Sequence, residues 1–370
     1  MERNFAMSGP FNFQDSPKLL SSPSIVLGEM DGRTDIKEWF QLWKPSEFID
    51  FQPPKDFILA GDCHVTRGGI TVLGGAPGVG KSRAALGLAI AGATGKGWMG
   101  FPVHSKFKTL VVQAENGPYR LKGELTDISE GITENLDDWL RVTPPPTYGL
   151  AFTEPGFRAA IEGIIDEWEP SLIIIDPWNR ATQGDKQADA QAALEGLFAC
   201  LPADPEKKPA ILIVHHLRKK SSDHKRKSGR DLLHELAGTY QIGSSARCVF
   251  ALEPASENTE DDRVVLTCCK NNDGIEGQPS AWHRKNGLFG ECEDFDWEAF
   301  NAGEIKEQGI NLEAIRRVLS GTDWLTRAAA VKRLVDADVC KRSAGFNALV
   351  RFESNFEKDQ SGKKIRLRKI

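Results

Sequence analysis

The stretch that most constrains the fold of this chain is Gly75 to Ser82, GAPGVGKS. It has the spacing of a phosphate-binding loop, in which glycines let the backbone turn tightly and point successive N–H groups at an anion. An apolar run, 70–74, precedes it, and an Ala- and Leu-rich segment, 82–93, follows. These flanks predict a buried strand and a helix whose N-terminus faces the phosphates. The strand–loop–helix context argues against the alternative, a chance Gly-rich turn.

The residue types in this loop predict which atoms hold a nucleotide. Lys81 can reach the β- and γ-phosphates, and the Ser82 hydroxyl can ligate Mg²⁺. The pattern therefore predicts ATP and Mg²⁺ as ligands. The residues expected around the nucleotide are Gly75, Ala76, Pro77, Gly78, Val79, Gly80, Lys81, Ser82 and Arg83.

Two further apolar runs lead to carboxylates. The run 108–114 is followed by Glu115, and 172–175 by Asp176. Ligands of open α/β sheets bind at the carboxyl ends of buried parallel strands, so both side chains are expected near the nucleotide. Glu115 can orient or deprotonate an attacking water, and Asp176 matches the carboxylate that supports Mg²⁺. A surface glutamate at a strand end is the alternative for Glu115.

A third apolar run, 210–214, ends in His215 and His216. A histidine at the end of the strand beside the Asp176 strand can sense the γ-phosphate. Adjacent side chains of a strand point to opposite faces, so only one of the two can face the nucleotide. A histidine that merely caps the strand is the alternative.

The stretch 218–230, RKKSSDHKRKSGR, is polar and has no apolar periodicity, which predicts a loop. Long loops in compact domains are usually functional, and seven Lys or Arg suit the phosphate backbone of a nucleic acid. A solvated insert is the alternative. The candidate contacts to single-stranded DNA are Lys219, Lys220, Lys225, Arg226, Lys227 and Arg230.

Composition fits a globular protein, with 40% hydrophobic and 27% charged residues over 370 positions. No run approaches the ~18 apolar residues of a membrane span, and the N-terminus has no apolar signal core. The seven cysteines show no paired metal spacing, and several lie in apolar runs as reduced thiols do. We therefore expect a cytoplasmic protein without a membrane partner.

The C-terminal segment differs in charge from the rest. Residues 303–370 carry 15 Lys and Arg against nine Asp and Glu, while the whole chain has a net charge of −5. Apolar periodicity predicts helices over 312–319, 326–337 and 341–352, then a hairpin from 355–358 and 364–368. This order resembles a winged-helix domain, which can place its third helix in a DNA groove or bind a protein. The candidate phosphate contacts are Lys341, Arg342, Arg351, Lys363 and Lys364.

The ordered set of motifs resembles the RecA-fold ATPases, and most closely the plasmid RepA type of hexameric replicative helicase. The resemblance covers about residues 46 to 290 and is specific in the phosphate loop, in LIIIDPW (172–178) and in ILIVHHLRK (211–219). It implies an α/β fold, a RecA-like P-loop NTPase core with a central, mostly parallel sheet. It also implies a homo-oligomeric, hexameric ring that binds ATP between subunits, with His215 or His216 coupling nucleotide state to a basic loop in the central channel.

By the same resemblance, Lys270 looks like the basic residue that related rings insert into the neighbour's site. This chain departs from the pattern at Asn272, where many relatives carry arginine. That departure puts the arginine supplied in trans in doubt, and Arg247 and Arg230 are its candidate substitutes.

The expected organisation is an N-terminal arm or tail over 1–45, a RecA-like ATPase domain over 46–300 and a winged-helix-like domain over 301–370. The expected function is an ATP-hydrolysing DNA motor of a plasmid, phage or mobile element that translocates on single-stranded DNA. A primase or an origin-binding protein is a further candidate partner. An ATP-dependent DNA-binding protein, helicase loader or regulator without unwinding activity stays open. A small-molecule phosphotransferase explains neither the basic loop nor the C-terminal segment.

Overall fold

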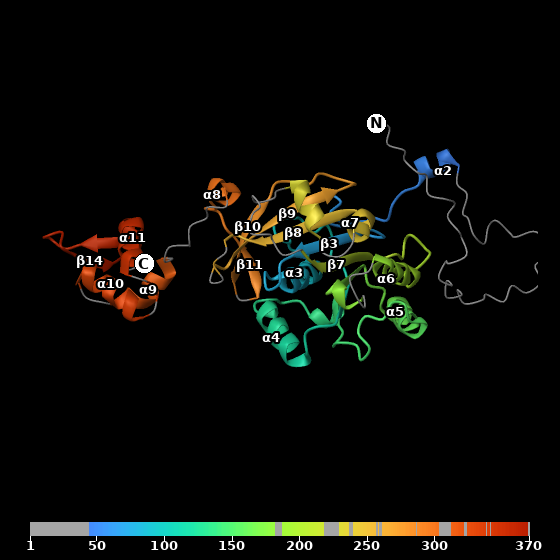
Figure 1. Cartoon of the computed structure of the whole chain (residues 1–370), viewed down its shortest axis with the longest axis horizontal. Helices are drawn as coiled ribbons and strands as arrows, with labels where there is room; N and C mark the ends of the chain where they lie inside the picture. The colour runs from blue at the N-terminus through green and yellow to red at the C-terminus, as the bar shows by residue number, and fades with distance from the viewer. Residues whose placement is uncertain are drawn as a thin grey trace, which may run out of the picture. The chain divides into compact units, whose positions relative to one another are not determined.

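The strand before the phosphate loop, β3 (Ile70–Gly75), is buried along its whole length inside a large sheet (Figure 1). This computed structural model describes residues 44–181, 187–217, 229–236, 240–256, 258, 261–285, 287–302, 312–321, 324–337, 339–340 and 342–368. The arm predicted over 1–45 lies outside these ranges except for its last two residues. The chain divides into two compact units, residues 1–52 and 53–370.

The described elements include the strands and helices predicted around the phosphate loop, Asp176 and the C-terminal segment, together with several short elements that the sequence did not predict. Unit 1 has α2 (Pro45–Asp50). The other strands are β1 (Ile58–Ala60), β2 (Val65–Thr66), β4 (Thr109–Gln113), β5 (Leu140–Val142), β6 (Leu172–Asp176), β7 (Ala210–His216), β8 (Cys248–Pro254), β9 (Arg263–Asn271), β10 (Ser280–Lys285), β11 (Leu288–Glu291), β12 (Leu325–Thr326), β13 (Phe356–Lys358) and β14 (Lys364–Leu367). The helices are α3 (Lys81–Thr94), α4 (Pro118–Ser129), α5 (Pro155–Trp168), α6 (Gln187–Ala199), α7 (Tyr240–Ser245), α8 (Trp297–Ala302), α9 (Leu312–Leu319), α10 (Arg327–Asp336), α11 (Arg342–Arg351) and the 3₁₀ turns η2 (Leu136–Asp138), η3 (Trp178–Arg180), η4 (Gly229–Glu235) and η5 (Glu353–Asn355).

The large sheet has the strand order β11-β10-β9-β8-β3-β7-β6-β4-β5 within the described residues. The six neighbouring strands β5, β4, β6, β7, β3 and β8 pair in parallel. β9, β10 and β11 extend the sheet beyond β8 by antiparallel pairing. Since β7 lies between β3 and β6, the carboxyl ends of these three strands meet at one edge of the sheet. This order and the mostly parallel pairing confirm the RecA-like α/β fold predicted from the sequence.

Both faces of the parallel strands are covered by apolar side chains. Helices α3 and α4 contribute to the layer that contains Leu73 and Leu212, and α5, α6 and α7 to the layer that contains Val72 and Ile213. Strands buried on both faces read as near-continuous apolar runs, which is why the sequence located them well.

The antiparallel strand β9 has its two ends at opposite edges of the sheet. Its first residue, Arg263, accepts a hydrogen bond from Ala255 N at 3.0 Å, just beyond the carboxyl end of β8. Near its other end, Lys270 pairs with Val249 at the start of β8. Lys270 therefore lies at the edge opposite the phosphate loop.

Some details could not be expected from the sequence. β10 is followed by β11, which pairs with it as a hairpin at the end of the sheet order. β11 and the two-residue β12 escaped prediction since neither shows an apolar alternation. β4 ends at Gln113, so Glu115 lies in the turn after the strand.

The C-terminal elements form their own apolar core. α9, α10 and α11 precede a three-stranded sheet of order β12-β14-β13, and the predicted helix and hairpin bounds hold to within one residue. The buried residues of this core are Ile315, Leu319, Ala330, Val331, Leu334, Ala348, Leu349, Phe356 and Ile365.

Two glycines of α3 give a matched test of the packing on this helix. A Cβ at Gly92 would overlap the buried ring of Phe107, whereas one at Gly87 would lie 3.8 Å from Trp98. We expect Gly92→Ala to lower the free energy of unfolding by about 1–3 kcal/mol, the usual cost of overpacking. Gly87→Ala should raise it by about 0.5–1 kcal/mol through helix propensity. Urea unfolding followed by tryptophan fluorescence measures both, and equal effects would contradict this packing.

Candidate nucleotide-binding site

The phosphate loop joins the carboxyl end of β3 to the first residue of α3. Gly78 and Gly80 have φ angles of +76° and +104°, a region that favours glycine. A Cβ at Gly75 would lie 2.7 Å from the carbonyl oxygen of Leu252. The Lys81 ammonium donates to the carbonyl of Ala76 at 2.8 Å, which holds its charge inside the loop. The loop is thus shaped as the sequence predicts, with Lys81 directed at the space that it encloses.

Asp176, the last residue of β6, lies beside the start of α3 and is 7% exposed. Its carboxylate accepts a hydrogen bond from the Ser82 hydroxyl, and burial raises its pKa to about 6 although Ser82 and Lys81 oppose the rise. Burial also lowers the pKa of Lys81 to about 8, against the attraction of Asp176 and Glu115. In both groups the loss of hydration outweighs the attraction between the opposite charges.

The turn after β4 places Glu115 next to this pair. The buried Gln113 side chain accepts from the backbone N–H groups of Glu115 and Asn116 at 3.2 and 2.8 Å and donates to the Asn116 carbonyl at 2.7 Å. Ala114 N donates to the Asp176 carbonyl at 2.9 Å, which ties β4 to β6. The Glu115 carboxylate is half-exposed and lies 4.0 Å from the guanidinium of Arg180. A carboxylate accessible to water thus stands beside the buried site.

The two histidines at the end of β7 have different surroundings. His215 is buried and pairs in register with Gly74, and His216 pairs with Gly75. Burial lowers the pKa of His216, as does the charge of Lys81, while Glu115 and a hydrogen bond to the backbone of Gly75 oppose the shift. The histidine beside the phosphate loop is therefore His216.

Lys270 lies away from this cluster. Its ammonium donates to the carbonyls of Gly243, Ser244 and Ala246, at 3.0, 3.3 and 2.6 Å, at the C-terminal end of α7. Burial lowers the pKa of Lys270, and the charge of Arg247 adds to this shift. The Arg247 side chain is 57% exposed and lies 3.7 Å from the Asp273 carboxylate. Within one chain neither cation reaches the phosphate loop.

Sequence reasoning missed two residues near the loop. The Arg284 guanidinium, from β10, donates to the carbonyl of Gly78 at 3.1 Å. Glu124, on α4, is 8% exposed, is bridged by Arg120 at 2.9 Å and contributes to the raised pKa of Asp176. Neither belongs to a sequence motif. Only weak sequence signals pointed to them. For Arg284 the signal was a charged residue near the end of a strand, and for Glu124 it was an arginine four residues earlier on the same helix.

The predicted nucleic-acid contacts are only partly within the described residues. Arg230 is there, and its guanidinium pairs with Glu276 at 2.9 Å. Arg342 is exposed at the start of α11. The candidates outside the described residues are Lys219, Lys220, Lys225, Arg226, Lys227 and Lys341.

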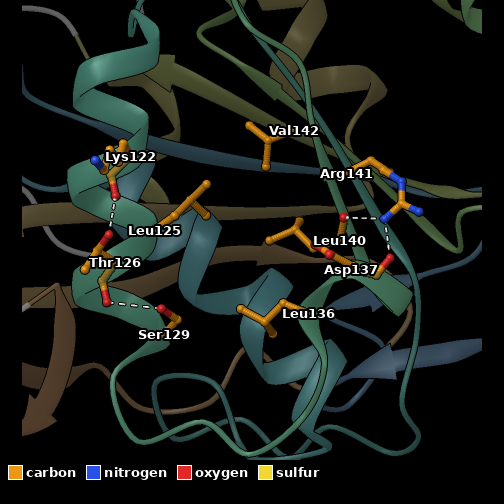
Figure 2. A pocket seen from close by; sticks show the side chains of 9 residues that line it. All are labelled: Lys122, Leu125, Thr126, Ser129, Leu136, Asp137, Leu140, Arg141 and Val142. Atoms are coloured by element: carbon orange, nitrogen blue, oxygen red, sulfur yellow. Dashed lines mark hydrogen bonds between the residues drawn. The ribbon is translucent and has the colours of Figure 1, made fainter.

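A separate open groove of about 700 Å³ lies between α4 and the η2–β5 segment (Figure 2). Leu125, Leu136, Leu140 and Val142 line it, and Figure 2 shows them between the helix and the strand. On its rim, Arg141 donates to the carbonyl of Leu140 at 3.1 Å. None of its lining residues belongs to the phosphate loop or its carboxylates, so this groove is not the nucleotide site.

Residues 37–222, half of the chain, match the AAA domain family. The chain belongs to this family. The match includes the phosphate loop, Glu115, Asp176 and His216, and it ends before β8. Together with the RecA-like fold, it identifies a nucleotide-binding ATPase.

No curated protein matches this AAA domain chain. Among solved structures it is similar to the RadB recombinase, at 13% identity and a TM-score of 0.42, over 61% of this chain and 92% of the recombinase. It is also similar to a KaiC-like protein from the hyperthermophilic archaea Pyrococcus horikoshii OT3, at 14% identity and a TM-score of 0.43, over 64% and 97% of the two chains. The fold assignment rests on the strand order and not on these scores. In the described part of the chain, every helix is too short or too polar to span a bilayer.

The raised pKa of Asp176 predicts a pH-dependent stability of the nucleotide-free protein kept in EDTA to exclude metal ions. An aspartate whose pKa rises from 3.8 to about 6 on folding favours the folded state below pH 4, and this contribution is lost as the pH rises through 6. We expect Asp176→Asn to raise the free energy of unfolding by about 2–3 kcal/mol at pH 7.5, at about 1.4 kcal/mol per pKa unit.

The same substitution should have little effect on stability at pH 4. Urea unfolding at the two pH values measures the difference, with the exposed Asp166 of α5 as the control position for Asp→Asn. A loss of stability of Asp176→Asn at pH 7.5 would contradict this prediction. It would show that attraction to nearby cations stabilises the Asp176 carboxylate more than burial destabilises it.

Proposed function

We propose that this protein is a ring-forming ATPase that translocates on single-stranded DNA, and that each ATP site is completed by a neighbouring subunit. The observation that carries the proposal is the placement of charge at two edges of one sheet. Lys81, Asp176 and Glu115 converge at the carboxyl edge, while Lys270 and Arg247 lie at the opposite edge. A head-to-tail ring would bring these two edges together between subunits.

The residues at the carboxyl edge fit a magnesium nucleotide. A hydroxyl and a carboxylate already in contact, Ser82 and Asp176, are oxygen ligands of the kind that Mg²⁺ takes, and the space around Gly78 is open to a phosphate. Ser82 and Asp176 would hold the metal, which supplies positive charge to the phosphates, and the loop backbone and Lys81 would bind the phosphates.

Glu115 is proposed as the base. Its exposure lets a water molecule reach the carboxylate, and the Gln113 hydrogen bonds keep its turn fixed. Glu115 would accept a proton from that water as it attacks the terminal phosphorus. His216, beside the Gly75 backbone and one residue before Leu217, connects this site to the basic stretch 218–230. Leu217, just before this stretch, forms an antiparallel bridge with Leu236.

For a cation in trans, Arg247 is better placed than Lys270. Lys270 already donates to three carbonyls at the end of α7, so its role within the chain is to hold that helix. The guanidinium of Arg247 is 57% exposed and its nearest carboxylate is 3.7 Å away. We infer that Arg247 neutralises charge on the neighbour's nucleotide. Lys270 would position Arg247 by binding the backbone carbonyl of Ala246, the residue before it.

The C-terminal elements support a winged-helix domain. Three helices followed by a hairpin, with β12 completing the small sheet, match the order that this domain requires. Exposed Arg342 on the third helix, with Lys363 and Lys364 at the hairpin, offers cations to DNA phosphates. Arg366 and Lys358 are less available, because Glu357 and Glu353 pair with them.

The first test is steady-state ATP turnover of the full chain with and without poly-dT, alongside its mass in solution. We expect DNA to stimulate turnover and the mass to indicate a ring. Glu115→Gln should bind ATP like the parent but lose at least about 100-fold in turnover, because it cannot accept the proton. Glu130→Gln, just after α4, is the matched control.

A monomer or dimer whose turnover ignores DNA would contradict the motor. That result favours an ATP-dependent DNA-binding protein or a loader without unwinding activity. Equal turnover by Glu115→Gln and the parent would show that Glu115 is not the base.

Mixing experiments test the shared site. Arg247→Ala and Lys81→Ala should each be inactive alone, and mixed rings should regain part of the turnover. Recovery occurs because some interfaces pair an intact loop with an intact arginine. A mixture of Lys81→Ala with Asp176→Ala, both at one edge, should regain none. No recovery in the mixture of Arg247→Ala with Lys81→Ala would contradict action in trans. Repeating that mixture with Lys270→Ala instead of Arg247→Ala shows which of the two cations is required.

A further inference from the structure

Arg284 connects the phosphate loop to the antiparallel half of the sheet. Its guanidinium donates to the carbonyls of Gly78 at 3.1 Å, Asp261 at 2.9 Å and Asp262 at 3.2 Å. A Cβ at Gly80 would lie 3.4 Å from the Cδ of Arg284, so the side chain runs along the loop. One side chain from β10 thus binds the carbonyl of Gly78 and passes close to Gly80.

The segment 261–263, whose first two carbonyls bind Arg284, is itself fixed by buried hydrogen bonds. The carboxylate of Asp261 is 1% exposed and accepts two hydrogen bonds from the Arg263 guanidinium, at 2.9 and 2.8 Å, and one from the Ser256 hydroxyl at 2.7 Å. The Arg284 backbone N–H donates to the Asp262 carbonyl at 3.0 Å. Arg284 therefore reaches the loop from a rigid base.

The three acceptors of Arg284 are neutral carbonyl oxygens. Among the described residues no carboxylate forms an ion pair with this guanidinium, which lies beside the loop proposed to bind a polyanion.

The bond to Gly78 also orients the loop backbone. In a planar trans peptide the carbonyl and the following N–H point in opposite directions. With the Gly78 carbonyl held by Arg284, the N–H of Val79 points to the other side, where it approaches the Ala76 carbonyl at 3.4 Å. That carbonyl also accepts from Lys81, so this is the inner side of the loop.

We propose that Arg284 is a positioning residue of the nucleotide site, which fixes the 78–79 peptide so that its N–H faces the phosphates and adds positive charge behind it. The inference rests on the nucleotide site of the proposed function and not on DNA. It makes nucleotide affinity depend on β10, a strand outside the segment that matches the AAA domain family.

The test uses the full chain with Mg²⁺ and a fluorescent ATP analogue, without DNA. We expect Arg284→Gln to weaken binding about 10-fold to 100-fold, the range for losing a hydrogen bond from a charged donor. KM should rise by a similar factor while kcat changes little, because the side chain holds the loop and touches no reacting atom. Arg284→Lys keeps the positive charge but loses the planar fork of donors, so its nucleotide affinity should lie between those of the parent and of Arg284→Gln.

His283→Asn is the matched control. His283 precedes Arg284 on β10 and its Nδ1 contacts the Asp262 carboxylate at 3.1 Å, so it pins the same turn without reaching the loop. The melting temperature of each variant without nucleotide reports any general loosening. The inference requires that Arg284→Gln lose most of the nucleotide-induced rise in melting temperature and that His283→Asn keep it.

Two results would overturn the inference: parent-like binding by Arg284→Gln, or equal weakening by His283→Asn. Should Arg284→Gln fail to fold, Arg284→Lys decides, since parent-like binding by it also overturns the inference. A parent that binds nucleotide but ignores DNA contradicts the proposed motor and leaves this inference intact.

Discussion

The rest of the site depends on a buried pair of opposite charges at the carboxyl edge of the sheet. Lys81 begins α3 after β3, and Asp176 ends β6, with β7 between the two strands. The Ser82 hydroxyl, next to Lys81 in the chain, donates to the Asp176 carboxylate. Burial disfavours both charged forms, as the pKa of about 8 for Lys81 and about 6 for Asp176 indicate. A bound magnesium nucleotide would supply the charges that water no longer solvates. The site is therefore organised for its ligand at some expense to the stability of the chain without it.

The sheet around this pair divides the work by direction of strand. The parallel strands end together and place Glu115, Asp176 and His216 at one edge. The antiparallel strand β9 runs back and connects the two edges, whereas β10 pairs only with the first residues of β9, near the carboxyl edge. β9 begins near the phosphate loop and carries Lys270 near its other end, and β10 carries Arg284 to the carbonyl of Gly78. A change at the loop can thus be transmitted along rigid strands toward the edge proposed to meet a neighbour.

Much of the fold and part of the site could be predicted from local patterns. The apolar runs before Asp176 and His215 identified strands because both faces of a parallel strand are buried, and the glycine spacing identified the loop because it needs φ values that other residues avoid. The three C-terminal helices followed from their apolar periodicity. The sequence also placed Glu115 near this edge, although β4 ends two residues before it. The Gln113 side chain accepts hydrogen bonds from the backbone of Glu115 and Asn116, which keeps the turn close to the end of the strand.

The sequence by itself determined the phosphate loop, the order of the parallel strands along the chain and the residue types at their ends. Only the tertiary structure decided which histidine faces the loop, that Lys270 lies at the far edge, and that Arg284 and Glu124 lie near the nucleotide site. The physical reason is separation along the chain. A motif encodes contacts within a few residues, whereas Arg284 meets Gly78 across 206 positions through the pairing of strands and the packing of their ends.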